Sequence, residues 1–532
     1  MYLDYRKDKS PKETIKTIKA ILGNNNIKVK ECKFKKFNNY LYYGRLKYNY
    51  FYGTNGKGIS KTLAKASAYA EFIERLQTNM LGNNKRLHKN LIVDRKNKYI
   101  KVLLKNATQE YYSEYIKLDD SYFYVDDFVD LKTNNIIKLP INSINAICHT
   151  NGLASGNTKT EATVQGICEI LERYAYKQLL NGEILSYSIE GYDKILSNTL
   201  QKILSKISKL GFKYEIKDCS LSKYPVVGFI LYNGEKNKYC YTLASDVNFN
   251  IAISRAITEM FQGQTKKSIL LKMKDVKMSL DFYDKKYGKN FKSYNWLNCF
   301  NYNNGIITSN MLCNKKININ KLFFKNDIKN NEEALQYLMQ LIENSIFIKD
   351  YNVLGFDTVR VYIPTMSEID SFDKEDLIIS RNYSKYKSIY CDILSATNKE
   401  LNDFIDMLLE ICKCIKFYNL VFPKDLFKVN SYSKYYKLSF TSLLILLCLI
   451  TNRKDDLKSV LQFQISNFIL SKEIVVSYSI LLDLISGKCS LKQHNMNIAR
   501  YFNEIIKNPK KYLLSLNPKT NITADILFEK LN

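Results

Sequence analysis

The stretch TNGLASGNTKTEATVQGICEILERY, residues 150–174, joins a glycine-rich turn to a segment with helical periodicity. Such a turn leaves backbone N–H groups free to meet an anion at the start of the helix. At about 100° per residue, polar side chains spaced three or four apart share one face of that helix. They are Glu161, Gln165, Glu169 and Glu172. The stretch therefore predicts a helix that presents carboxylates beside an anion-binding turn.

The same order of motifs occurs nearer the N-terminus. A TNG triplet at residues 54–56 precedes an ExxER motif at 71–75, as the triplet at 150–152 precedes one at 169–173. The ExxER motifs are offset by 98 residues and the triplets by 96, so two additional residues in the second loop account for the difference. We interpret the copies as an internal pseudo-repeat. On the first helix Ser67, Glu71 and Glu74 share a face, and Arg255 and Glu259 form a third, shorter copy.

Two interpretations of these glutamates are open. Glutamates three or four residues apart on one helix more often form a solvated face that pairs with Lys or Arg. Both helices, however, are rich in Ala, Val, Ile and Leu around the carboxylates, which favours burial in a polar pocket. Converging carboxylates would take up protons or bind a divalent cation that prefers oxygen ligands, and magnesium is the natural occupant. No GxxxxGK[ST] loop and no kinase catalytic loop occurs, so a nucleotide site here would be unconventional.

Strand and helix signals alternate over the first three quarters of the chain. We expect strands at 35–52, 122–129, 224–232, 239–243 and 358–363, and helices at 13–22, 61–80, 160–180, 198–210, 251–262 and 331–343. After Asn398 only helical patterns remain, at 399–414, 439–450, 455–470 and 475–485. The predicted fold class is α+β, with layered sheets and helices, followed by an all-α domain. The predicted domains are residues 1–395 and 396–532.

Composition excludes several classes of protein. The 532 residues are 46% hydrophobic and 13% aromatic, enough for a large core and more than one domain, so a disordered or fibrous chain is excluded. The longest apolar run, Leu438 to Ile450, is shorter than the ~20 residues of a membrane span, and no membrane association is expected. Twelve scattered cysteines without a CxxC pair or a secretory signal predict a reduced, cytoplasmic protein. Cys412 and Cys414 lack the neighbouring ligands that a zinc site needs.

The charge of the chain admits an anionic partner. Lys and Arg number 80 against 52 Asp and Glu, a formal charge of +28, which would suit nucleic acid, a phosphorylated substrate or an acidic peptide. The lysines are spread along the whole chain among many Asn, Ile and Tyr, as in proteins from AT-rich genomes, and no nucleic-acid-binding signature accompanies them. Nucleic acid is therefore not an expected partner. A basic RNA-binding protein remains an alternative that predicts salt-sensitive RNA retention.

The glutamate and arginine motifs described above resemble those of the YcaO family. The similarity extends through TNGKG at 54–58, TNGLASGNT at 150–158, TEMFQGQ at 258–264 and VRVYIPTMSEI at 359–369. It runs nearly the full length of the founding subfamily, whose helical C-terminal part looks like a tetratricopeptide-type domain. The motifs that carry the match are Ser67-x-x-x-Glu71-x-x-Glu74-Arg75, Glu161-x-x-x-Gln165-x-x-x-Glu169-x-x-Glu172-Arg173 and Arg255-x-x-x-Glu259.

The resemblance implies an ATP- and Mg²⁺-dependent enzyme that phosphorylates the carbonyl oxygen of a peptide or protein backbone amide. Phosphorylation turns a poor leaving oxygen into a good one, so that a nucleophile can attack the carbon. A Cys, Ser or Thr side chain of the substrate would give an azoline ring by cyclodehydration, as in ribosomally synthesised peptides. External sulfide would give a thioamide, and methylthiolation of a ribosomal protein is the third outcome associated with the family.

The resemblance also implies roles for individual residues. Arg173 and Arg255 would act in catalysis by facing phosphate oxygens, where charge develops during transfer. Ser67, Asn157 and Gln165 would line the nucleotide pocket. An N-terminal lysine contacts nucleotide in the family, and Lys7 is the residue expected here, although Lys9 and Lys12 lie nearby. The magnesium ligands implied are Glu71, Glu74, Glu161, Glu169, Glu172 and Glu259.

The sequence departs from azoline-forming relatives at its end. The segment from Ala524 to Asn532 lacks the PxPxP tail of many cyclodehydratases, and no zinc-binding leader-recognition domain is present. Both absences favour the founding subfamily. The expected partners are a peptide or protein substrate, with a ribosomal protein as one candidate, a radical methylthiotransferase or sulfur-delivery protein, and a second copy of the chain. The alternative from another class is a non-catalytic scaffold that holds nucleotide and acts through the helical domain.

Overall fold

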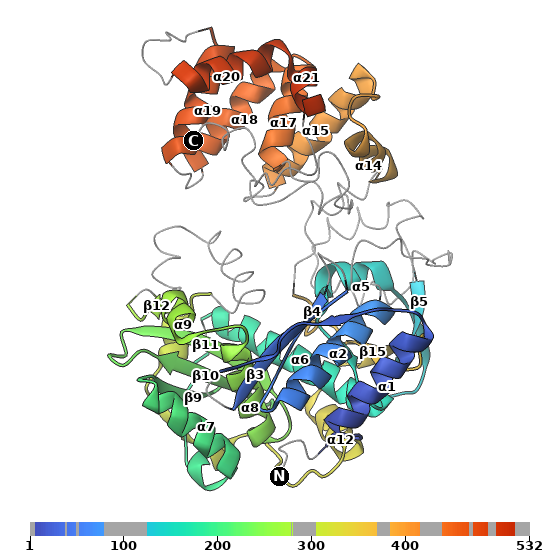
Figure 1. The fold of residues 1–532 in the computed structure, drawn as a ribbon, viewed down its shortest axis with the longest axis vertical. Helices are drawn as coiled ribbons and strands as arrows, with labels where there is room; N and C mark the ends of the chain where they lie inside the picture. Colours follow the sequence, from blue (N-terminus) through green and yellow to red (C-terminus); the bar gives the residue numbers. More distant parts are fainter. Residues whose placement is uncertain are drawn as a thin grey trace. The chain divides into compact units, whose positions relative to one another are not determined.

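The computed structural model describes residues 6–37, 40–48, 53–78, 125–182, 184–277, 279, 305–369, 383–414, 439–467, 472–487 and 496–515. The chain forms two compact units (Figure 1). The first comprises Met1–Ala107 and Phe123–Ser371, and the second comprises Thr108–Tyr122 and Phe372–Asn532. The first unit mixes sheets and helices and the described part of the second is helical, which confirms the predicted fold class.

The smallest sheet of the first unit carries helix α2. Its strands are β1 (Lys30–Glu31), β2 (Lys35–Phe37), β3 (Leu41–Lys47) and β4 (Gly53–Gly58), in the order β1-β3-β2, with β4 antiparallel to β3. Helix α2 (Lys61–Gln77) packs on β4, and α1 (Pro11–Asn24) packs on α2. A Cβ atom at Gly56 would overlap the carbonyl oxygen of Ala64 and lie 2.6 Å from the Cβ of Ala68. The turn predicted at 54–56 is therefore wrong, because this glycine lies in a strand and permits the close approach of a helix.

The six-stranded sheet is covered by helices on both faces. Its strands run in the order β12-β11-β10-β9-β8-β13. In β10 (Val226–Tyr232) every residue is buried, and alternate side chains enter two different cores. Phe229 packs with α7 (Asn198–Lys209) and α8 (Phe249–Phe261), whereas Ile230 packs with α6 (Lys159–Leu180). The remaining strands are β8 (Ser188–Glu190), β9 (Lys213–Asp218), β11 (Lys238–Ser245), β12 (Lys274–Asp275) and β13 (Lys316–Asn318).

The five-stranded sheet lies against the other side of α6. Its strand order is β6-β5-β14-β15-β7, and all its pairs are antiparallel. Helix α6 contacts β7 and β15 of this sheet as well as β10 and β11 of the six-stranded sheet, so the stretch at 150–174 forms the centre of the unit. The predicted turn at 150–152 is confirmed, with Gly152 at φ +79°. The strands are β5 (Val125–Asp130), β6 (Ile136–Pro140), β7 (Leu153–Ser155), β14 (Phe347–Asp350) and β15 (Thr358–Tyr362).

Short elements complete the first unit. Helix α12 packs against α6. In the described residues no helix is long and apolar enough to cross a membrane. Over both units, eight cysteines in the part of the chain that the structure describes are free thiols, among them Cys168 and Cys219. The short helices and turns are α5 (Ile141–Cys148), α9 (Lys266–Lys272), α12 (Asn331–Leu341), η2 (Tyr192–Lys194), η3 (Ser309–Leu312) and η4 (Ile319–Lys321).

The described part of the second unit is a bundle around α17 (Phe440–Ile450), where nine consecutive residues are buried. Ile389, Tyr390 and Ile393 pack into the same core, so α14 belongs with this unit, although the boundary predicted at residue 395 assigned it to the first. The side chains of Cys412 and Cys414 lie outside the described set. The tetratricopeptide-like character stays a prediction. The other helices are α14 (Tyr383–Cys391), α15 (Asn398–Cys414), α18 (Lys454–Asn467), α19 (Lys472–Ile485), α20 (Met496–Lys507) and α21 (Pro509–Ser515).

Candidate functional site

Three helices of the first unit begin in the same way, directly after a strand. Strands β4, β7 and β11 each lead through a polar capping residue into α2, α6 and α8. Ser60 accepts a hydrogen bond from the Leu63 N–H, and Thr158 accepts one from the Glu161 N–H, at 3.1 Å in both cases. Asn248 caps α8 in the same position. Because a cap fixes where a helix begins, it also fixes the direction of the polar face that follows.

The polar faces of these helices line one cavity of about 1030 Å³. Ligand pockets typically measure about 300–1,000 Å³, so this one has room for a nucleotide and part of a second substrate. All twelve residues singled out in the sequence line this cavity. They are Lys7, Ser67, Glu71, Glu74, Asn157, Glu161, Gln165, Glu169, Glu172, Arg173, Arg255 and Glu259.

The negative charges of the carboxylates on α2 and α6 are only partly balanced by positive side chains nearby. Burial raises the pKa of Glu74 to about 8 although Arg75 lies 3.1 Å away, and the neighbouring Glu169 and Glu71 add to the rise. Burial likewise raises the pKa of Glu71 and of Glu169, against the opposing effect of nearby arginines. A cluster of this kind favours either protons or an added cation.

Cationic side chains from α6 and α8 lie in the same cavity. Arg255 donates a 2.8 Å hydrogen bond to Gln165, which fixes the direction of its guanidinium group. Burial disfavours the charge of Arg255, but Glu172 and other anionic neighbours hold its pKa above the usual value. Arg173 lies 4.0 Å from Glu172. Two arginines beside a carboxylate cluster can receive the oxygens of a phosphate chain.

Lys57 is a site residue to which the sequence assigned no role. It projects from β4, forms an ion pair with Glu259 and lies in the field of Glu172 and Glu71. Loss of hydration lowers the pKa of Lys57 to about 8, against the opposing effect of these two glutamates. The TNGKG motif at 54–58 contained the signal, but it could not show that the lysine faces α8.

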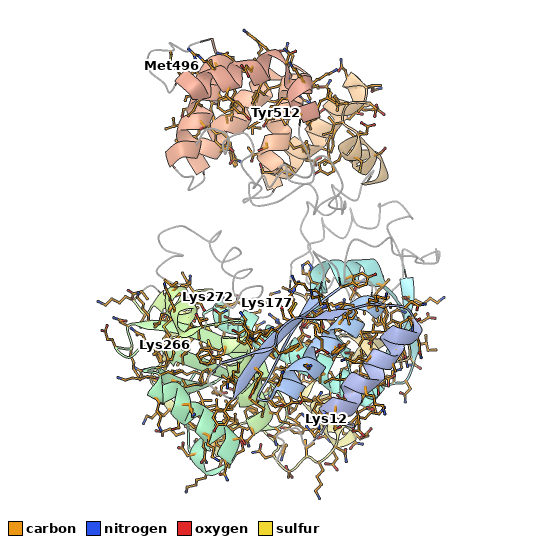
Figure 2. All side chains as sticks on the ribbon, in the orientation of Figure 1. Lys12, Lys177, Lys266, Lys272, Met496 and Tyr512 are labelled. Carbon is orange, nitrogen blue, oxygen red and sulfur yellow. The ribbon has the colours of Figure 1, made fainter. Side chains whose placement is uncertain are left out.

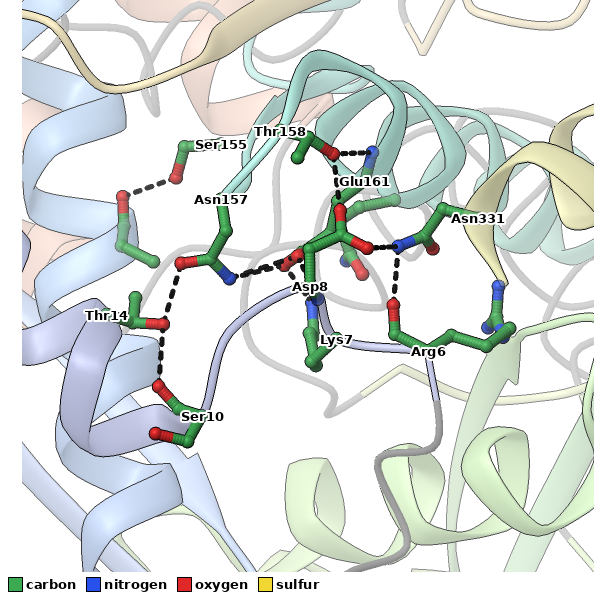
Figure 3. Close-up of polar contacts among 12 residues, drawn as sticks. Arg6, Lys7, Asp8, Ser10, Thr14, Ser155, Asn157, Thr158, Glu161 and Asn331 are labelled. Atoms are coloured by element: carbon green, nitrogen blue, oxygen red, sulfur yellow. Dashed lines mark hydrogen bonds and ion pairs between the residues drawn. The ribbon is translucent and has the colours of Figure 1, made fainter. Parts of the chain in front are cut away.

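Glu161 differs from the other predicted magnesium ligands because three donors make four hydrogen bonds to its carboxylate. Lys7 Nζ lies 2.9 Å from one oxygen, the Asp8 N–H lies 3.1 Å from the other, and the Asn157 amide reaches both (Figure 3). Burial would raise the pKa of Glu161, but Lys7 and Asn157 lower it below the usual value. Among the three N-terminal lysines that the sequence left open, Lys7 is the one that pairs with a predicted site residue.

The residue types that line the cavity suit ATP and magnesium, although the described carboxylates are not arranged as a set of metal ligands. The glutamates offer the oxygen ligands that Mg²⁺ prefers, and burial leaves several of them short of positive charge. Arg173, Arg255 and Lys57 offer the donors that phosphate oxygens need. Within the described residues no three acidic, His or Cys side chains are grouped closely enough to hold a metal ion. Ion pairs to Lys7, Lys57 and Arg75 already engage some of these carboxylates.

Comparison with known protein families supports the binding of ATP and Mg²⁺. Residues 55–367 match the family described as YcaO cyclodehydratase, ATP- and Mg²⁺-binding. A Haemophilus influenzae protein described as uncharacterized is 26% identical over 360 residues, 62% of this chain and 59% of that protein. The Escherichia coli ribosomal protein S12 methylthiotransferase accessory factor YcaO is 26% identical over 363 residues, with the same coverage. The chain thus spans about 59% of the length of these curated relatives.

Solved structures that the comparison matched include YcaO from Methanopyrus kandleri bound with AMPPCP and Mg²⁺, at 16% identity and a TM-score of 0.47. The alignment covers 70% of this chain and 95% of that one. A heterocyclase in complex with substrate and cofactor is 14% identical with a TM-score of 0.47, over 68% of this chain and 53% of the other. The family match covers more than half of the sequence and includes eleven of the twelve cavity residues named above. The chain belongs to the YcaO family, which binds ATP and Mg²⁺.

Proposed function

We propose that this protein uses ATP and Mg²⁺ to activate a backbone amide of a peptide or protein by phosphorylating its carbonyl oxygen. The observation that carries the proposal is the meeting of α2, α6 and α8 at one cavity, where buried and half-buried carboxylates lie with two arginines and Lys57. Membership of an ATP- and Mg²⁺-binding cyclodehydratase family supports it.

The residues of the cavity divide by their charge. The acidic residues would hold magnesium, and they are Glu71, Glu74, Glu169, Glu172 and Glu259. Glu161 would join them once Lys7 leaves its carboxylate and pairs with the nucleotide instead. Bound ATP and magnesium supply the transferable phosphoryl group and the cations that neutralise it.

The cationic and polar residues would hold the nucleotide itself. Arg173 and Arg255 would orient the phosphate chain and stabilise the negative charge that develops during transfer. Gln165 keeps the Arg255 guanidinium in place through the 2.8 Å hydrogen bond described above. Ser67 and Asn157 would contact the nucleotide from α2 and from the loop before α6.

The fate of the activated amide depends on the nucleophile. Cyclodehydration to an azoline, thioamide formation with sulfide and assistance to methylthiolation are the three outcomes we consider. The Escherichia coli relative is named as an accessory factor for modification of ribosomal protein S12, which makes a ribosomal protein and a methylthiotransferase the first substrate and partner to test. We place the protein in the cytoplasm with these partners.

The test follows the oxygen atoms. The protein is incubated with ATP, Mg²⁺, ribosomal protein S12 or a peptide panel, and sulfide, in water enriched in ¹⁸O. Amide activation gives phosphate whose new oxygen comes from the amide and is unlabelled, whereas attack by water labels the phosphate. Substrate-dependent, unlabelled phosphate that is lost in Glu172→Gln and kept in the exposed Glu332→Gln supports the proposal. Binding of ATP without consumption under every condition would favour the scaffold alternative.

A further inference from the structure

The segment that precedes α1, residues Arg6–Ser10, contributes to the wall of the cavity, and we refer to it as the strap. Figure 3 shows it running beside the start of α6, with Lys7 directed at Glu161 and with Asn331 next to Arg6 and Asp8. Arg6, Lys7 and Lys9 all line the cavity. The strap therefore contributes cationic side chains to the site from a part of the chain remote in sequence from the three helices.

A buried ion pair holds the first residue of the strap. Arg6 pairs with Asp246, 240 residues away, and their side chains are only 7% and 6% exposed. Asp246 lies between β11 and α8, where its carboxylate also accepts a 2.9 Å hydrogen bond from the Asn248 N–H at the start of α8. Taking two charges out of water is expensive, so such a pair is weak evidence for stability and points instead to a requirement for one position of the segment.

Two further contacts fix the backbone around Lys7. The buried amide of Asn331, at the start of α12, donates to the Arg6 carbonyl oxygen at 2.5 Å and to the Asp8 carboxylate at 3.1 Å. The Asp8 carboxylate also accepts a hydrogen bond from Thr158, the capping residue of α6. Residues on both sides of Lys7 are thus held by elements that line or flank the cavity.

The geometry points to a positioning role: we propose that Asp246 and Asn331 hold the strap so that Lys7 reaches the Glu161 end of the nucleotide site. This inference rests on the proposed function, because it assigns Lys7 to that site. Lys7 Nζ lies 2.9 Å from Glu161, although its side chain is 37% exposed and comes from an irregular segment. Without the anchors on either side, a lysine of this kind would sample many rotamers.

The experiment is a double-mutant cycle on the full chain with Mg²⁺ and ATP as the probe. Lys7→Ala and Asp246→Asn should each weaken ATP binding about tenfold, equal to 1.4 kcal/mol at 25 °C. Because Asp246 acts through Lys7, the double variant should bind ATP no more weakly than Lys7→Ala alone. Asp246→Glu, which keeps the charge, should recover most of the affinity.

A second readout follows the strap itself. Trypsin cleaves after Arg6, Lys7 and Lys9, so Asp246→Asn should speed cleavage at these bonds severalfold, as measured by mass spectrometry. The matched control is Asp126→Asn, which removes an ion pair with Lys349 on the five-stranded sheet and should change neither readout. If Asp246→Asn fails to fold, Asn331→Ala takes its place in the same cycle.

The outcomes separate the two proposals. Additive losses, about a hundredfold in the double variant, would overturn the positioning role while leaving the nucleotide site intact. Faster cleavage with unchanged ATP affinity would also overturn it, because the strap would then serve the fold alone. A folded wild type that does not bind ATP would refute the proposed function, and the inference would fall with it.

Discussion

Lys57 shows how a single side chain can connect the three helices of the site. It extends from β4, pairs with Glu259 on α8 and is surrounded by Glu71 on α2 and Glu172 on α6. The positive charges of Arg255 and Arg173 lie close enough to Lys57 to lower its pKa further. We therefore expect a phosphate chain in the cavity to gain a third cationic donor from this strand.

Replacing Lys57 with Met should weaken ATP binding by roughly tenfold, because one charge-assisted hydrogen bond to phosphate is lost. Isothermal titration calorimetry with Mg²⁺ and ATP measures the change. The matched control is Lys61→Met, at the exposed start of α2. An unchanged dissociation constant for Lys57→Met would show that this lysine only balances Glu259.

Neither Lys57 nor the residues that anchor the strap, Asp246 and Asn331, could be assigned from the sequence, for a physical reason. Each ExxER motif lies within a single helix, where 3.6 residues per turn determine the direction in which each side chain points. The partners of Lys57 and Arg6 lie about 200 and 240 residues away along the chain, and only the packed fold brings them together. All twelve residues suggested by the helical motifs and the family resemblance do line one cavity, while their roles stay predictions.

The packing of α2 on β4 determines the position of the two α2 carboxylates in the site, those of Glu71 and Glu74. Gly56 sits under Ala64 and Ala68, one to three turns before Glu71 and Glu74. A side chain at this position must push the helix away from the strand, and the carboxylates would move with it.

Gly56→Ala should therefore lower the free energy of unfolding by about 1–3 kcal/mol and weaken ATP binding at the same time. Chemical denaturation and calorimetry give the two values. Gly23→Ala is the control, because a Cβ atom at this helical position meets nothing within 4 Å and should be neutral or slightly stabilising. Normal stability and affinity in Gly56→Ala would contradict the packing argument.

Glu31 ties β1 to both helices that cover this sheet. Its carboxylate accepts from Lys65 at 2.6 Å and from Tyr69 at 2.9 Å on α2, and pairs with Lys19 on α1 at 2.8 Å. Partial burial opposes ionisation, but these three donors together lower the pKa of Glu31 to about 2. The ionised Glu31 carboxylate therefore stabilises the folded state at pH values above the pKa that Glu31 has in the unfolded chain.

Glu31→Gln should reduce the free energy of unfolding by roughly 1 kcal/mol at neutral pH, allowing for partial solvent screening. Because the folded pKa lies below the unfolded value of 4.5, this stability is present above pH 4.5 and disappears as the pH falls towards 2. Denaturation of wild type, Glu31→Gln and the exposed control Glu332→Gln across this range measures it. A difference that stays constant with pH would contradict the assignment.

Long periodic helices were predictable, and short or glycine-rich strands were not. Helices α6, α7 and α8 begin and end within two residues of the predicted bounds, because their apolar faces repeat every three to four residues. Strand β4, with the sequence GTNGKG, has no alternation of apolar side chains and is held instead by pairing with β3. The prediction also omitted strand β9 and helices α20 and α21, although α20 is as long as the predicted helix α7.

At the scale of the molecule, the described hydrophobic cores separate the two units. One core draws its buried residues from Ile389 to Leu513, and the other three draw theirs from Ile18 to Met366. The positive charge has no such division, since exposed lysines occur in both units, for example Lys12 on α1 and Lys266 on α9 (Figure 2) in the first and Lys510 on α21 in the second. This distribution agrees with compositional bias as the source of the +28 charge.

Separate cores predict separate responses to ligand and mutation. Leu446→Ala, in the buried helix α17, should destabilise the helical unit by about 2–5 kcal/mol and leave the dissociation constant for ATP unchanged. ATP at a hundredfold excess over its dissociation constant should stabilise only the first unit, by about 2.7 kcal/mol. Calorimetric unfolding with and without ATP resolves the two effects. A loss of ATP binding in Leu446→Ala would show that the units depend on each other.

The central claim is that the carboxylates and arginines around the cavity bind MgATP. The most direct measurement is isothermal titration calorimetry of ATP with and without Mg²⁺ on wild type, Glu172→Ala, Arg255→Ala and the control Glu332→Ala. We predict Mg²⁺-dependent binding in wild type and control, with a loss of at least about 2 kcal/mol in each cavity variant. Binding that survives both cavity substitutions, or none in a folded wild type, would contradict the account.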